Sequence, residues 1–96
     1  MNNNYNSVSS YKPMPTWEST YTNHILKRNK GKKIDAFMTF PHSNEWRDQT
    51  FKGIIENADT EHLIMSDPSN GNWYLLPMEY INFIKFEEQV NINEAF

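Results

Sequence analysis

Cysteine is absent from the 96-residue sequence, which excludes disulfide bonds and thiolate chemistry and leaves the redox compartment open. Long apolar runs are also absent, because no stretch approaches the roughly 20 residues that a membrane helix needs. The opening residues Met1 to Asn4 carry neither a basic segment nor an apolar one, so we expect no signal peptide. Three isolated glycines give no phosphate-binding loop. We therefore expect a small protein that is made and kept inside a cell.

Positive charge is scarce in the second part of the chain. Residues 34–96 hold three cations and eleven acids, whereas residues 1–33 hold six cations and one acid. The two parts therefore carry net charges of −8 and +5, so that a basic neck over 27–33 precedes an acidic body. The body repels phosphates, whose neutralisation supplies most non-specific affinity for nucleic acids. The neck could still contact an anion, but the charge distribution disfavours nucleic acid as a partner.

Short segments of alternating apolar and polar residues follow one another after the neck. Such alternation predicts strands with one buried face. The predicted strands are 33–40, 49–58, 61–66, 72–76 and 81–87. Gly53 lies in the middle of the second strand and predicts a sharp bend or a bulge, which small barrels need in order to curl. The fold class is therefore mainly β: a small, strongly bent, five-stranded barrel of the Sm-like or SH3-like type.

A short helix over 16–28 is predicted ahead of the strands. Trp17, Tyr21 and Ile25 recur at helical spacing, basic residues occupy the last turn, and Gly31 is a suitable stop. Because the apolar stripe is narrow, we expect this helix to dock on the barrel without joining its core.

The chain is predicted to have three parts. Residues 1–16 are rich in Asn, Ser, Tyr and Pro and form a disordered polar tail. Residues 17–88 form the helix and the barrel. Residues 89–96 form a loose C-terminal tail.

No catalytic, metal or cofactor site is predicted. His24, His42 and His62 lack the short spacings that zinc sites use. The nearest nucleophile–base arrangement is Ser66-Asp67 beside His62, but Asp67 is better explained as a turn residue that bonds the backbone. We therefore predict that the protein is not an enzyme.

Several segments, arriving in order and at matching spacing, resemble the GerQ family of spore coat proteins from endospore-forming bacteria. They span about 70% of the chain, from Tyr21 to Glu88. The matching residues are Asn29-Lys30-Gly31-Lys32, Met38-Thr39-Phe40, Glu45-Trp46, Phe51-Lys52-Gly53-Ile54-Ile55-Glu56, His62, Ser66-Asp67-Pro68, Gly71, Tyr74-Leu75-Leu76-Pro77-Met78, Tyr80 and Phe86.

This resemblance implies a structural protein of the spore coat, made in the mother cell cytoplasm. Proteins of this family help to place a cortex-lytic cell wall hydrolase in the coat, and so permit germination triggered by calcium dipicolinate. They are also substrates of a coat transglutaminase, which joins lysine amines to glutamine side chains. The implied partners are the hydrolase, the transglutaminase and other coat proteins.

Cross-linking in the family is implied for lysines that precede the shared domain. Here that head is short and offers Lys12 alone, with the neck lysines as substitutes: Lys27, Lys30, Lys32 and Lys33. Gln49 and Gln89 are the acyl donors within this chain.

Three aromatic residues are candidates for an interaction surface, because aromatic residues are enriched among interface hot spots. They are Trp46, Trp73 and Tyr74. Trp73 and Leu75 share one face of their strand, so at least one of Trp73 and Tyr74 should be buried.

The alternative function is an Sm-like oligomeric module that binds nucleic acid or protein and has no role in the coat. In RNA-binding Sm-like proteins, the loops after the second and fourth strands carry an Asn and an Arg-Gly pair. Here residues 59–62 and 76–79 carry neither motif. A homo-oligomer through the edge of the fifth strand stays open.

Overall fold

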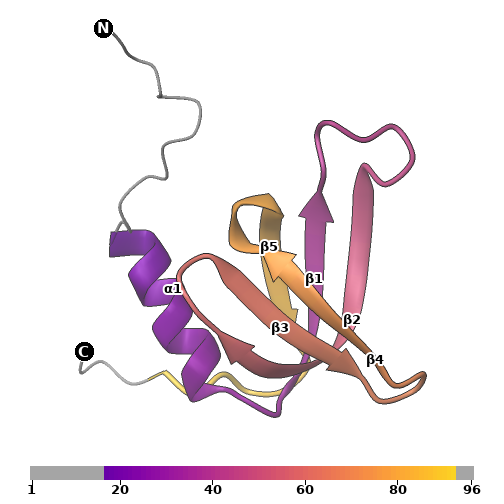
Figure 1. Cartoon of the computed structure of the whole chain (residues 1–96). Coiled ribbons are helices and arrows are strands. Elements are labelled where there is room, and N and C mark those ends of the chain that lie inside the picture. The colour runs from indigo at the N-terminus through magenta and orange to yellow at the C-terminus, as the bar shows by residue number, and fades with distance from the viewer. Residues whose placement is uncertain (1–16, 93–96) are drawn as a thin grey trace, which may run out of the picture.

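The computed structural model describes residues 17–92, with one α-helix and five strands (Figure 1). The elements are α1 (Trp17–Arg28), β1 (Lys33–Thr39), β2 (Asp48–Ala58), β3 (His62–Asp67), β4 (Asn72–Pro77), the 3-10 turn η2 (Met78–Tyr80) and β5 (Ile81–Phe86). Neither helix in this range has the length and apolarity needed to cross a bilayer. The tail predicted over 1–16 lies outside the described residues.

The strands form a single antiparallel sheet in the order β4-β3-β2-β1-β5. β1 lies inside the sheet and pairs with both β2 and β5, so that Ile34 is opposite Gly53 on one side and Phe86 on the other. β4 and β5 are the two edges, and η2 connects them. The prediction of a mainly β fold with five strands and a short helix is confirmed. The predicted closure into a barrel and the predicted Sm-like type are not confirmed, because the sheet is open between β4 and β5.

One face of the curled sheet holds the core, as the alternation predicted. Its buried apolar side chains are Leu26, Ile34, Ala36, Met38, Ile55, Ala58, Leu63, Met65 and Leu76. Leu26 comes from α1, so the prediction that the helix stays outside the core was wrong. Its position was missed because it lies beside the stripe of aromatic residues and Ile25 that defined the predicted face.

Gly53 lies where the backbone of β3 comes very close to β2. A Cβ atom at this position would overlap the carbonyl oxygen of Ser66 and lie 2.9 Å from its carbonyl carbon. The shift in register between β2 and β3 occurs farther along, between Ile55 and Asn57. Gly53 therefore serves the bend through this close approach, and the bulge is at a different position.

We predict that Gly53→Ala lowers the free energy of unfolding by about 2 kcal/mol, because β2 and β3 must separate to admit a methyl group. Gly71→Ala is the control, since Gly71 has a φ of 76° but nothing within 4 Å of an added Cβ. It should cost about 1 kcal/mol, from backbone strain alone. Urea unfolding of the three proteins measures both values, and equal stability of wild type and Gly53→Ala would contradict the crowding.

Candidate functional site

The two tryptophans predicted as contact residues are both exposed, at separate places. Trp46 lies in the loop between β1 and β2 and is 58% exposed, and Trp73 lies on β4 and is 65% exposed. Tyr74, the third candidate, points to the opposite face and packs on Phe51, with ring centroids 5.0 Å apart. Tyr74 is thus the half-buried member of the pair Trp73 and Tyr74, and the exposed candidates are the two tryptophans.

The loop that carries Trp46 is held by its own hydrogen bonds. The backbone N–H of Phe40 donates to the carbonyl of Arg47 (2.6 Å), and the N–H of Trp46 donates to Ser43 Oγ (2.8 Å). The guanidinium of Arg47 donates to the carbonyl of Pro41 (3.0 Å). In Figure 1 this loop extends from the end of the sheet farthest from α1. Trp46 is therefore presented on a loop whose conformation is set before any partner binds.

The outer face of β4 carries a second apolar site. Leu75 is 64% exposed and lies two residues from Trp73, so both side chains are on one face. The neighbouring positions on β3 are Ser66, opposite Trp73, and Ile64, opposite Leu75. The alternation along this strand predicted that Trp73 and Leu75 share a face, but it did not single out Leu75 as part of an interaction surface.

At the other edge of the sheet, Phe83 of β5 stacks on Phe37 of β1, with centroids 4.5 Å apart. Phe83 is 58% exposed. These two residues were not singled out from the sequence. An apolar residue at a position where the alternation expects a polar one is a signal that could have found them.

Between the two edges, an acidic group is buried among lysines. Asp35 of β1 is 2% exposed, and its Oδ2 lies 3.2 Å from Nζ of Lys52 and 3.9 Å from Nζ of Lys85. Burial by itself raises the pKa of Asp35. The hydrogen bond from Lys52 and the charges of Lys52 and Lys85 outweigh this effect, so the pKa is held below its ordinary value of 3.8.

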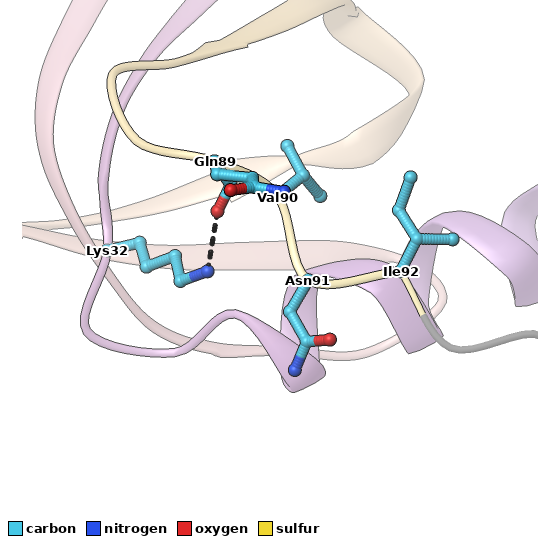
Figure 2. Close-up of a pocket in the computed structure, with 5 residues that line it drawn as sticks. All are labelled: Lys32, Gln89, Val90, Asn91 and Ile92. Atoms are coloured by element: carbon cyan, nitrogen blue, oxygen red, sulfur yellow. Dashed lines mark hydrogen bonds between the residues drawn. The ribbon is translucent and has the colours of Figure 1, made fainter.

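The neck lysines differ in what their amines contact. Lys27, Lys30 and Lys33 are exposed, whereas Lys32 donates through Nζ to the carbonyl of Gln89 at 2.7 Å (Figure 2). Lys12 lies outside the described residues. Of the two glutamines, Gln89 is exposed and Gln49 is half-buried.

Asn29 ties the end of α1 to the segment after β5. Its buried side chain donates to the carbonyls of Ile25 (2.7 Å) and Asn91 (3.1 Å), and it accepts from the N–H of Asn91 (2.8 Å). Figure 2 shows residues 89–92 running past the neck and lining a pocket with Lys32. Of the segment predicted as a loose tail, Gln89 and Asn91 are hydrogen-bonded to Lys32 and Asn29, and 93–96 lie outside the described residues.

The nucleophile–base arrangement considered from the sequence is not assembled. Ser66 Oγ donates to Glu56 at 2.6 Å, and Asp67 accepts from the N–H and hydroxyl of Ser69 in the following turn. His62 Nδ1 is instead 3.5 Å from Asp59. Across residues 17–92, no three His, Cys, Asp or Glu side chains are grouped to hold a metal ion.

Exposed aromatic side chains such as those of Trp46 and Trp73 are characteristic of proteins that act through contacts with other macromolecules. A family model described as "Spore coat protein (Spore_GerQ)" matches residues 17–92. The chain belongs to the GerQ family of spore coat proteins, which confirms the resemblance seen in the sequence. Its location is the spore coat, and its role there is structural.

The chain is similar to "Spore coat protein GerQ" of Bacillus subtilis (strain 168). The two are 42% identical over 73 residues, which is 76% of this chain and 40% of the relative. The chain therefore spans less than half of the length of the relative that it matches.

We predict that Asp35→Asn lowers the free energy of unfolding at neutral pH by about 1 kcal/mol, because a charged hydrogen bond is lost while the mostly exposed lysines return to water. Since the folded pKa is depressed, the ionised carboxylate stabilises the fold above pH 3.8 and loses this effect as the pH falls through the folded pKa. The difference between variant and wild type should therefore vanish in acid. Chemical unfolding across pH measures this difference, with replacement of the exposed residue Glu79 on η2 (Glu79→Gln) as control. A difference independent of pH would contradict the ion pair.

Proposed function

We propose that this protein retains a cortex-lytic cell wall hydrolase in the spore coat and thereby permits germination triggered by calcium dipicolinate. Support comes from membership in the GerQ family, for which this role is implied. The matched region, 17–92, includes the whole helix and sheet together with the loop that carries Trp46.

The observation that carries the proposal is the exposure of Trp46 on an ordered loop. Large aromatic side chains dominate the binding energy of many interfaces, and a loop fixed in advance loses less conformational entropy on binding. The three hydrogen bonds around Ser43, Pro41 and Arg47 supply that order. The hydrolase therefore docks, in this proposal, on the loop between β1 and β2.

Spores that lack this protein should fail to germinate with exogenous calcium dipicolinate and should still respond to a nutrient. Their coat extracts should also lack the hydrolase. Complementation with Trp46→Ala should leave the protein in the coat but fail to restore either property, whereas Trp73→Ala should restore both. Normal germination of the deletion strain with both triggers would refute the recruiting role.

We further propose that the neck is a substrate of the coat transglutaminase. An amine must be free to attack the acyl-enzyme, and the amines of Lys27, Lys30 and Lys33 are on exposed residues. Lys32 is a poorer substrate, because its amine is engaged with the carbonyl of Gln89.

Incubation of the purified chain with transglutaminase and a glutamine-containing peptide should label Lys27, Lys30 or Lys33 and spare Lys32. Peptide mapping by mass spectrometry identifies the sites. Lys32→Arg should leave total labelling unchanged, and joint replacement of the three exposed lysines by Arg should abolish most of it. If labelling survives that replacement and is lost with Lys12→Arg, the reactive amine lies in the head and the neck is not the substrate.

A further inference from the structure

The edge strand β4 carries little of what usually keeps sheet edges from pairing. Natural edge strands carry charged residues or Pro, are very short, or are twisted by bulges, and of these β4 has only Pro77, its last residue. β4 is Asn-Trp-Tyr-Leu-Leu-Pro, with no charge in six residues and no shift in its register with β3. Its outward side chains, Trp73 and Leu75, are both mostly exposed.

The opposite edge is better protected. β5 contains Lys85, and the acids Glu87 and Glu88 follow directly after it. Its register with β1 also shifts between Phe37 and Met38. Of the two edges of the sheet, β4 is therefore the one prepared to accept a further strand.

The pairing of β3 with β4 determines which backbone groups of β4 are free. The N–H of Met78 donates to the carbonyl of Glu61 at 2.8 Å, so position 78 faces β3. Because hydrogen-bonded positions alternate along an antiparallel ladder, Tyr74 and Leu76 also face β3. Trp73 and Leu75 then direct their N–H and C=O groups outward, whereas Pro77, the next outward position, has no N–H to donate.

We propose that two copies of this chain pair antiparallel through β4, with Trp73 of each copy opposite Leu75 of the other. In this register every free N–H and C=O of Trp73 and Leu75 meets its complement across the twofold axis. Centring the axis on Leu75 would instead place Trp73 opposite Pro77 and lose a donor. Centring it on Trp73 would place Leu75 opposite Gly71, at the turn beyond the strand.

The side chains complete the same arrangement. Trp73 and Leu75 lie on one face, so each aromatic ring would cover the aliphatic side chain of the opposite copy, a cross-strand pair that stabilises sheets. The strand is uncharged, so its pairing with itself brings no like charges together within the ladder. The nearest acids, Asp67 and Glu79, lie beyond its two ends. A second copy therefore fits this edge without any hydrolase or other coat protein.

Sedimentation equilibrium of the 96-residue chain tests the proposal. We expect a mass that rises with concentration to twice the 11.4 kDa of the monomer and no further. Hydrogen exchange followed by NMR should show the amides of Trp73 and Leu75 becoming protected over the same concentration range. The amide of Tyr74 should be protected throughout, because it faces β3.

Trp73→Lys and Leu75→Lys should each abolish the dimer while leaving the circular dichroism spectrum of the monomer unchanged, since both side chains are exposed. The matched controls are Trp46→Lys in the β1–β2 loop and Phe83→Lys on β5, which should dimerise like wild type. A chain that stays monomeric at NMR concentrations would overturn the proposal. So would a dimer insensitive to Trp73→Lys, or larger assemblies that Phe83→Lys abolishes, since the latter would mean pairing of β4 with β5 in rings or open chains.

Discussion

The close approach of β3 to β2 at Gly53 is the contact on which the shape of this sheet depends. The absence of a side chain allows the backbone at Ser66 to lie almost against β2, and the sheet curls around Ile55 and Met65 as a result. Curvature of this kind lets a chain with few strands enclose a core that a flat sheet would leave open to water. The helix completes the enclosure through Leu26, so the basic neck enters the sheet at a fixed position.

The strands could be predicted well from the sequence because their cause is local. Alternation and turn residues define each segment, and the observed bounds differ from the predicted ones by at most one residue at either end. Features that depend on distant partners could not be predicted in this way. The buried side chain of Asn29 bonds Asn91, which is 62 positions away. The buried carboxylate of Asp35 lies beside lysines of two neighbouring strands. An aspartate in a strand is unusual, and this was the available signal.

In the candidate interaction surface, too, local features could be predicted and features that depend on distant partners could not. Alternation established that Trp73 and Tyr74 lie on opposite faces, but only the packing of Tyr74 on Phe51 shows which of them is exposed. Family membership was readable because its motifs recur in order along the chain. The contacts of each lysine amine could not be predicted, because the amine of Lys32 meets the carbonyl of Gln89 only when the segment after β5 returns to the neck. The exposed sites also lie on different elements, which allows one small domain to contact more than one neighbour.

The hydrogen bonds of Asn29 to Ile25 and Asn91 have a mechanical consequence. Both ends of the described domain are fastened at one point, because Asn29 bonds the end of α1 to Asn91. A pull on α1 passes through Asn29 to residues 31 and 32, which exchange backbone hydrogen bonds with Ile55 (2.7 and 3.1 Å). It then reaches β1, which is bonded along both sides. Tension along this strand is shared by two ladders at once, so the fold would resist extraction more strongly than its modest size suggests.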